Sequence, residues 1–500
     1  MKREYLLGID IGTSSVKTVL FDSVGNSVAV ASEQYGLKRN GAHVEQNPQD
    51  YYWAIQKSIS ALRETRSAEM DAIVGIGLTG QTPTDIFLDR EGQPLMAGIS
   101  WQDTRAVDEA RRIREKFGVE KMREMVANNV PITASWSASR YLWFTKHCPE
   151  LAKRCTKVSF PKDYVGFRMT GTHLSDAWNM RSTVNLQTGR GNEELLSFLG
   201  ISSEQLPLIG QVQTLRGGLT EVAAKELGLK SGIPVSVGCG DALATMLGSG
   251  VLLSPGVAFD SAGTSEIIGM SIQSGDYGTE ELMTVPKSVT NTLPIVYGPT
   301  QSGSGSLVWL LRNILRKEDM DDALAEASTV PAGSDGMLFL PYLAGERAPL
   351  WLPHVRGGFS GMSAAHTSAH LIRATLEGVG YSVNHCLDLI SKKCNVAPKV
   401  IRVSGGGSRI PLWLQIKADI TGTPIETLEC DNACALGAAM TVAVGIGMFS
   451  DFAEVSKAMV RLQNRLEPNM EQHETYKRGF LQYLFESKTA VDRLQFQLEG

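Results

Sequence analysis

One short pattern occurs twice in the chain and limits the folds that the chain can adopt. Residues 8–22 read GIDIGTSSVKTVLFD, and residues 256–271 read GVAFDSAGTSEIIGMS. Each copy combines an apolar strand carrying one aspartate, a Gly-Thr-Ser turn and a second strand. Because the copies lie roughly half a chain length apart, they predict an internal duplication, with two related domains that each open on a β-hairpin.

The length of the chain agrees with a duplicated architecture. A chain of 500 residues is long for one hydrophobic core and fits two domains of ordinary size. A glycine-rich stretch at residues 238–256 is suited to a hinge and lies close to the second hairpin. We therefore expect an N-terminal domain over residues 1–248 and a C-terminal domain over residues 249–500.

Composition excludes several classes of protein. A net charge of −5, without a basic run, gives no support for nucleic-acid binding. Seven cysteines without a CxxC pair predict reduced thiols and a cytoplasmic location. The uncharged, strongly apolar run at residues 433–449 is shorter than the roughly 20 residues that span a bilayer, so we expect a buried helix there and no membrane association. Asp10 ends the first apolar stretch too early for a signal peptide.

Strand and helix patterns alternate along the first part of the chain. Residues 5–9, 16–22 and 28–31 read as strands of an antiparallel meander. Residues 46–64 have apolar side chains at helical spacing, and residues 72–82 begin as a strand buried on both faces and end in a polar loop. This alternation predicts α/β architecture.

Three further stretches have simple structural interpretations. The aromatic run Tyr51, Tyr52 and Trp53 is expected in the hydrophobic core. His366 and His370 have HxxxH spacing on an expected helix, but without a third ligand they do not indicate zinc. The charged segment 312–327 is expected to form a solvated amphipathic helix.

The two Gly-Thr-Ser turns admit two interpretations: polar hairpin tips, or a cradle for phosphate groups. Two copies favour the cradle, since backbone N–H groups and hydroxyls from both hairpins could converge on the β- and γ-phosphates of a nucleotide. A third glycine turn, between a strand at 400–403 and a helix beginning near Pro411, would let an adenine or ribose approach the backbone. The candidate nucleotide-binding residues are Gly12, Thr13, Ser14, Lys17, Gly263, Thr264, Ser265, Gly405, Gly406 and Gly407.

Together with further segments, these motifs resemble the FGGY family of carbohydrate kinases. Residues 137–150 are similar to the first family signature, with Arg140 where lysine is usual, and residues 357–377 are similar to the second. The segments 339–351 and 431–445 also resemble family segments. The resemblance implies two duplicated ribonuclease H-like ATPase domains of the actin and hexokinase type, with a cleft between them, and the use of ATP and Mg²⁺.

The resemblance also implies a catalytic base. Asp241 matches the catalytic aspartate of the family, although an aspartate before a helix would equally act as its N-cap. Asp10 is assigned to Mg²⁺, through water, because Mg²⁺ prefers oxygen ligands and keeps several waters. Asp260 holds the corresponding place in the second hairpin and receives no role.

For the sugar, the candidates are Gln81, Thr82, Trp101, Asp103 and Arg105, which include an amide, a carboxylate and an aromatic face. The layout is most similar to xylulokinases and implies a ketose or polyol substrate. However, residues 80–84 read GQTPT where xylulokinases have Gly-Gln-Met-His-Gly, so the sugar is left open.

Several alternatives remain open. One is another kinase of the family, acting on gluconate, glycerol, erythritol or ribulose. Another is a non-enzymatic ATP-binding protein of the actin fold. A nicotinamide-dependent dehydrogenase lacks the required glycine fingerprint. A homodimer is the default expectation for the assembly.

Overall fold

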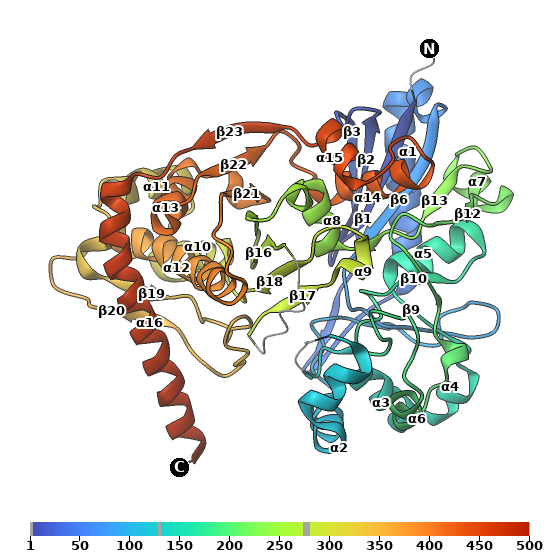
Figure 1. Ribbon diagram of the computed structural model, residues 1–500, viewed down its shortest axis with the longest axis horizontal. Coiled ribbons are helices and arrows are strands. Elements are labelled where there is room, and N and C mark those ends of the chain that lie inside the picture. Colours follow the sequence, from blue (N-terminus) through green and yellow to red (C-terminus); the bar gives the residue numbers. More distant parts are fainter. Residues whose placement is uncertain (1–3, 129–131, 274–280, 500) are drawn as a thin grey trace. The chain divides into compact units, whose positions relative to one another are not determined.

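The computed structural model describes residues 4–128, 132–273 and 281–499. The chain divides into two compact units, which are described one at a time. Unit 1 contains residues 1–250, 285–292 and 432–460, and unit 2 contains residues 251–284, 293–431 and 461–500. Figure 1 colours the chain by sequence, so the return of a late segment to unit 1 is visible as red helices α14 and α15 beside the blue strands. The predicted domain division at residues 248 and 249 stays a prediction.

Unit 1 is built around a mixed sheet whose strand order is β12-β13-β6-β1-β2-β3, with β14 paired to the end of β6. The first three strands are antiparallel neighbours, which confirms the predicted meander. Strands β6 and β1 run parallel, as do β13 and β6. The bounds are β1 Tyr5–Ile11, β2 Ser15–Asp22, β3 Ser27–Gln34, β6 Ile73–Gly80, β12 Leu215–Gly218, β13 Pro234–Ser236 and β14 Cys239–Gly240.

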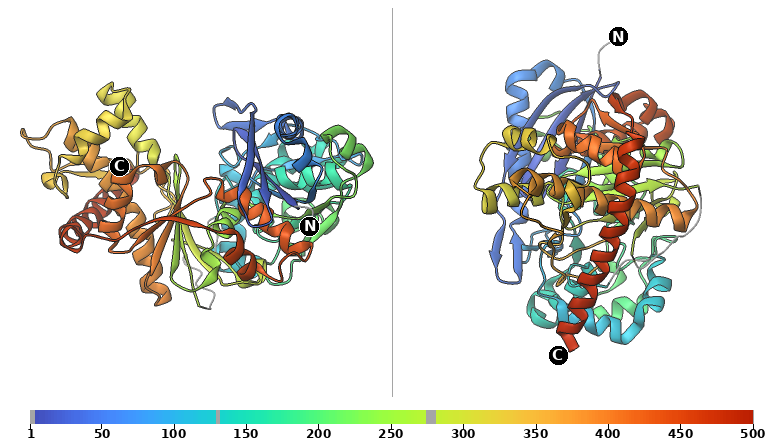
Figure 2. Two further views of the ribbon diagram at one scale, coloured as in Figure 1. Left: turned by 90° about the horizontal axis from the view of Figure 1, so that it is seen from above. Right: turned by 90° about the vertical axis from the view of Figure 1, so that its left-hand side faces the viewer.

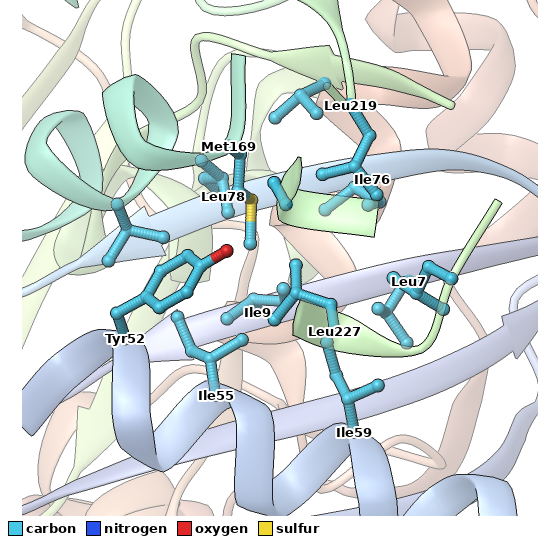
Figure 3. Close-up of a cluster of buried hydrophobic side chains, with 14 of the residues drawn as sticks. Leu7, Ile9, Tyr52, Ile55, Ile59, Ile76, Leu78, Met169, Leu219 and Leu227 are labelled. Carbon is cyan, nitrogen blue, oxygen red and sulfur yellow. The ribbon is translucent and has the colours of Figure 1, made fainter. Parts of the chain in front are cut away.

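Helix α1 (Pro48–Met70) confirms the helix predicted over residues 46–64, although it begins two residues later, with Asn47 as N-cap and Pro48 in the first turn, and extends further. Its apolar face packs on the sheet beside α5 and α7, and Figure 3 shows Tyr52, Ile55 and Ile59 pointing at strand residues such as Leu7 and Ile9. The expectation for the aromatic run is wrong at one position: Trp53 is 45% exposed. Consecutive residues of a helix point about 100° apart, so three in a row cannot all face the core.

The opposite side of the sheet carries two helices that place functional residues. Helices α8 (Asp241–Gly248) and α14 (Ala433–Gly445) pack closely through glycines. A Cβ on Gly437 would lie 1.8 Å from the Ala244 carbonyl oxygen, and one on Gly248 would lie 1.9 Å from that of Ala433. The buried helix expected at the long apolar run is therefore confirmed, and glycine is required at its contact with α8.

We expect Gly437→Ala to destabilise the protein by about 1–3 kcal/mol, because the added methyl group forces the two helices apart. Chemical denaturation monitored by circular dichroism measures the change. The matched control is Gly36→Ala, where a Cβ meets nothing within 4 Å. Equal stability of the two variants would contradict the close packing of α8 on α14.

The remaining elements of unit 1 are short strands and helices that surround the central sheet. Two of the small sheets, β4-β5-β8 and β7-β9, carry the segments that lead into the candidate sugar loops. The bounds are β4 Lys38–Asn40, β5 His43–Gln46, β7 Ile86–Leu88, β8 Gly98–Ile99, β9 Lys157–Ser159, β10 Leu174–Asp176, β11 Leu208–Gly210, α2 Val107–Val126, α3 Ser137–His147, α4 Pro149–Arg154, α5 Pro161–Thr170, α6 Glu193–Leu199, α7 Glu221–Leu227, α9 Lys287–Thr290 and α15 Phe452–Met459.

Unit 2 repeats the sheet of unit 1. Its strand order is β17-β18-β16-β15-β21-β22-β23, and from β18 to β23 its parallel and antiparallel pairs follow the same sequence as those from β3 to β12. The duplication predicted from the two hairpins therefore extends over six strands of each sheet, as expected for two ribonuclease H-like domains. The bounds are β15 Val257–Ala262, β16 Glu266–Ser271, β17 Met283–Val285, β18 Ile295–Pro299, β21 Val400–Ser404, β22 Ile425–Leu428 and β23 Leu462–Leu466.

The helices of unit 2 correct two expectations. His366 lies in the turn before α12 and not on the helix, whereas His370 lies in its first turn beside the N-cap Thr367. The segment 312–327 is split, because a π-helical turn ends at Leu315 and α11 begins only at Met320. The bounds are α10 Ser304–Trp309, α11 Met320–Ser328, α12 Ser368–Cys394, α13 Pro411–Thr421, α16 Met470–Glu499, β19 Leu338–Leu340 and β20 Gly358–Ser360.

The long helix α16 packs along α13, and its C-terminal end projects past the rest of unit 2 (Figures 1 and 2). Among the described residues, no helix combines the length and apolar character needed to cross a membrane.

Candidate active site

The first Gly-Thr-Ser turn joins β1 and β2 and is held by side chains from three later segments. Gln46 donates to the Thr13 carbonyl oxygen at 2.6 Å, and the Trp101 indole N–H donates to Thr13 Oγ1 at 3.0 Å. The Tyr35 hydroxyl donates to the Gly12 carbonyl oxygen. Ser14, in contrast, is exposed. The turn is thus fixed from one side and presents its tip to solvent, as an anion-binding turn requires.

Asp10 lies just before this turn and opposite Lys17 across the hairpin. Its Oδ1 atom is buried and has no hydrogen-bond partner among the described residues. Burial raises the pKa of Asp10, although the charge of Lys17 lowers it. A buried carboxylate oxygen without a partner fits a cation or the water that a cation holds. Because Mg²⁺ is often held by one or two carboxylates together with waters and substrate phosphates, a single carboxylate such as Asp10 fits this ion.

Asp241 is brought beside Asp10 by the order of the strands. Asp10 pairs with Thr79 on β6, and Thr79 pairs with Cys239 on β14, so three neighbouring strands end together. Asp241 follows β14 directly as the first residue of α8. Its Oδ1 accepts a hydrogen bond from the Ala242 N–H at 2.7 Å. Because ligands of parallel sheets bind beyond the carboxyl ends of strands, this end of the sheet is the expected site.

The N-cap interpretation of Asp241 is wrong by one residue. The cap position is occupied by Gly240, whose backbone is extended, and Asp241 already has helical conformation. The carboxylate still lies at the N-terminal end of α8, where the helix dipole presents positive partial charge.

The N-terminus of α14 completes this cluster. The Cys434 thiol lies 3.5 Å from the Asp241 carbonyl oxygen and 3.9 Å from Thr79 Oγ1. Burial raises the pKa of Cys434 well above its usual range, and the charges of Asp10 and Asp241 raise it further. Cys434 is therefore a neutral thiol that lies beside Asp10 and the first residue of α8.

The predicted sugar-side residues fall into two groups. The Gln81 side chain contacts Gln46 and Thr84, and Thr82 Oγ1 is buried without a hydrogen-bond partner in the described chain. Trp101 contacts the first Gly-Thr-Ser turn through Thr13. These three residues surround the ends of β1 and β6, which is consistent with a role in binding the acceptor.

Asp103 and Arg105 contact each other. The Arg105 guanidinium donates to both carboxylate oxygens of Asp103 and also to Glu45, and Asp103 Oδ2 accepts from the Val44 N–H. The Asp103 side chain is fully buried. A contact of either residue with sugar stays a prediction, whereas their contacts with one another fix the loop that carries Trp101.

Arg140 connects the two loops that carry the predicted sugar-side residues, the loop of Pro83 and the loop of Ser100. This fully buried guanidinium forms an ion pair with Asp85, which is also fully buried. It also donates to the Ser100 carbonyl oxygen at 2.7 Å and to the Pro83 carbonyl oxygen at 3.1 Å. Because arginine presents a planar fork of donors, one side chain can hold both loops at once.

In unit 2, the second Gly-Thr-Ser turn is enclosed by a loop that the sequence analysis missed. The backbone N–H groups of Gly303 and Ser304 donate to the carbonyl oxygens of Thr264 and Gly263, at 2.8 and 2.9 Å. Gly405 and Gly407 pack on Ala262, the last residue of β15. The loop at residues 300–304 is rich in glycine and serine, and this composition is the feature of the sequence that could have indicated a turn-enclosing loop.

Asp260 differs from Asp10 in its surroundings. Lys417 Nζ lies 2.6 Å from Asp260 Oδ2 and 2.8 Å from Glu266 Oε1, and all three side chains are buried. Burial and the neighbouring Asp260 raise the pKa of Glu266 to about 8, although Lys417 opposes the shift. Asp260 therefore forms a buried ion pair with a lysine, although its Oδ1 atom, like that of Asp10, has no hydrogen-bond partner among the described residues.

The loop over the second turn is anchored by Glu346, whose Oε1 accepts from the Gln301 and Arg347 N–H groups at 2.6 and 2.8 Å. Burial raises the pKa of Glu346 from 4.5 to about 8. Between these pH values the folded chain holds a proton that the unfolded chain has lost, so stability falls as the pH rises from 4.5 to 8.

We expect Glu346→Gln to reduce this dependence of the free energy of unfolding on pH by up to about 1.4 kcal/mol per pH unit. Urea unfolding of both proteins at pH 5.5 and 7.5 measures how the free energy of unfolding changes with pH. An equal change in the wild type and in Glu346→Gln would contradict a buried neutral carboxyl group at Glu346.

Comparison with known proteins agrees with this architecture. Residues 5–248 match the N-terminal domain, and residues 259–446 the C-terminal domain, of the FGGY family of carbohydrate kinases. The chain is 31% identical to a xylulose kinase from Staphylococcus epidermidis over 97% of its own length and 96% of that protein. Its fold matches crystal structures of a gluconate kinase and a xylulose kinase from Lactobacillus acidophilus, each with a TM-score of 0.90 and 26% identity. The gluconate kinase match covers 99% of this chain and 100% of that one, and the xylulose kinase match covers 98% of each.

The matches to both family domains and to the relatives show that the protein is a carbohydrate kinase, an enzyme that transfers a phosphoryl group to a sugar. Within that class, the chain belongs to the FGGY family, which confirms the resemblance seen in the sequence.

Proposed function

We propose that the enzyme transfers the γ-phosphoryl group of ATP to a hydroxyl of a neutral ketose or polyol, with Asp241 as general base. One observation carries the proposal: Asp241 and Asp10 lie together at the ends of β14 and β1, beside the sugar-side loop 80–84. Separate carboxylates for a proton and for a metal are what phosphoryl transfer to an alcohol needs.

The chain's own groups divide the work as follows. Asp241 accepts the proton of the attacking hydroxyl and holds that oxygen towards the phosphorus atom. The turns Gly12–Ser14 and Gly263–Ser265 donate backbone and hydroxyl hydrogen bonds to phosphate oxygens, and Gly405–Gly407 lie against the nucleoside. Asp10 orients the waters of Mg²⁺, which offsets phosphate charge when bound. Positioning and charge stabilisation supply most of the acceleration in such reactions.

The arginines beside the sugar loops favour a neutral acceptor. An aldonate such as gluconate requires a cation for its carboxylate. Arg105 is already bound to Asp103 and Glu45, and Arg140 to Asp85. Xylulose itself is not singled out, because the loop 80–84 departs from the xylulokinase pattern.

A second candidate is an aldonate kinase. The observation in its favour is that the fold matches a gluconate kinase as closely as it matches a xylulose kinase. A coupled assay of ADP formation with pentuloses, hexuloses, polyols and gluconate separates the candidates. We expect a neutral ketose or polyol to give the highest kcat/KM; a higher value for gluconate would overturn the proposed acceptor class.

The assignment of Asp10 to Mg²⁺ predicts that replacing this residue weakens the enzyme's use of Mg²⁺. We expect Asp10→Asn to raise the Mg²⁺ concentration for half-maximal activity 10–100-fold, the usual cost of removing a carboxylate that orients metal-bound groups. Asp260→Asn is the matched comparison, since Asp260 is bound to Lys417; it should change stability and leave the Mg²⁺ requirement unaltered. An unchanged Mg²⁺ titration of Asp10→Asn would show that Asp10 is structural.

A further inference from the structure

Asn179 has a buried polar side chain that makes no hydrogen bond to another described residue. It follows β10, is 2% exposed, and neither Oδ1 nor Nδ2 has a hydrogen-bond partner among the described residues. A carboxamide carries two donor hydrogens and one acceptor oxygen, and leaving all of them unpaired in the interior is unfavourable. Such a group needs an explanation, and a bound ligand is one.

Asn179 faces the residue that precedes the proposed base. A Cβ built on Gly240 would lie 3.2 Å from Asn179 Oδ1 and 2.5 Å from Thr82 Cγ2. Thr82 Oγ1 is also buried and unpartnered in the described part of the chain. Two orphaned polar side chains, from segments about 100 residues apart, therefore meet beside Asp241.

The backbone of Asn179 is rigidly supported. Its N–H donates to Asp176 Oδ1 at 3.0 Å, and Asp176 Oδ2 forms a buried ion pair with Lys162 at 3.0 Å. Lys162 also contacts Asp163, which in turn binds Arg216. A side chain held on such a network is pre-organised for a ligand, because its position does not depend on the ligand's arrival.

Resting on the proposed function, we propose that Asn179 and Thr82 bind acceptor hydroxyls next to the one that Asp241 deprotonates. The Asn179 Nδ2 group donates to one hydroxyl oxygen, its Oδ1 accepts from a neighbouring hydroxyl, and Thr82 Oγ1 makes a third contact. A donor and an acceptor side by side match a vicinal pair of neutral hydroxyls. A carboxylate could use the donor alone, because Oδ1 would repel it.

The sign of the stability change separates this role from a structural one. Asn179→Leu and Thr82→Val replace unpaired polar groups with apolar groups of similar size. If these groups serve only a ligand, the free enzyme keeps or gains thermal stability in both variants, whereas a structural hydrogen bond would lower it. At the same time, we expect KM for the acceptor to rise at least tenfold in each variant, with KM for ATP unchanged.

Discrimination between acceptors gives the second readout. The wild-type enzyme should reject a deoxy analogue that lacks the vicinal hydroxyl, because the site's polar groups are then left unpaired. We expect Asn179→Leu to lose most of that preference. The matched control is Asn192→Ala, since the Asn192 side chain caps α6; it should lower stability and leave both KM values unchanged.

The outcomes are distinct. A wild-type enzyme that forms no ADP with any acceptor defeats the proposed function itself. An active wild-type enzyme, with Asn179→Leu and Thr82→Val that are less stable but unchanged in acceptor KM and preference, overturns this inference and leaves the proposed function standing.

Discussion

Replacing Asp241 with asparagine should lower kcat by about 10²–10⁴-fold, the usual contribution of a positioned general base. The amide is isosteric with the carboxylate and accepts the same hydrogen bond from Ala242, so the start of α8 is retained. It has no basic oxygen that can take the acceptor's proton. Steady-state kinetics with the best acceptor from the substrate panel measure the loss.

Binding of ATP is the internal control for this variant. The proposed nucleotide groups lie on the Gly-Thr-Ser turns and the Gly405–Gly407 turn, so the dissociation constant for ATP should change less than threefold. Asp319→Asn, at the N-cap of α11, is the matched substitution outside the site and should leave kcat unaltered. If Asp241→Asn kept wild-type turnover, another group would have to be the base.

Replacing Arg140 with methionine should destabilise the protein by about 3–5 kcal/mol, because it leaves the buried Asp85 carboxylate without its partner. Burial raises the pKa of Asp85, and Arg140 is the main influence that lowers it. The loops at Pro83 and Ser100 also lose the donors that hold them. Urea unfolding measures the loss of stability. A rise in KM for the acceptor reports that the two loops are no longer held in place.

Two further variants test whether the unpaired Asp85 carboxylate causes the destabilisation of Arg140→Met. The double variant Arg140→Met and Asp85→Leu removes both charges and should recover most of the lost stability. Arg140→Lys keeps the charge but cannot reach both carbonyl oxygens, so it should fall between the wild type and Arg140→Met. A double variant as unstable as Arg140→Met would show that packing, and not the unpaired charge, dominates.

Local features of the sequence predicted much of the fold. The two hairpins, α1 and the buried helix α14 follow from periodicity, caps and turn residues, which act over a few positions. The exposed Trp53 was not predicted, although the geometry of a helix already excludes three consecutive core positions. The loop position of His366 was not predicted because the sequence pattern did not fix where α12 begins.

The candidate site was predicted only in part, because its decisive contacts join distant segments. The sequence indicated Asp10 and Asp241 separately, and their proximity depends on the pairing of β1, β6 and β14. Neither the neutralisation of Asp260 by Lys417, 157 positions away, nor the orphaned amide of Asn179 leaves a local pattern. Long-range strand order and burial create these features, and both are properties of the folded chain.

The most direct test of the account is acceptor-dependent ADP formation by the purified enzyme with MgATP, measured for the wild type and Asp241→Asn in parallel. The account predicts rapid ADP formation by the wild type with at least one neutral ketose or polyol, slow formation without an acceptor, and near-background rates for Asp241→Asn. Wild-type ADP formation that is the same with and without every acceptor, or equal in the two proteins, would contradict it.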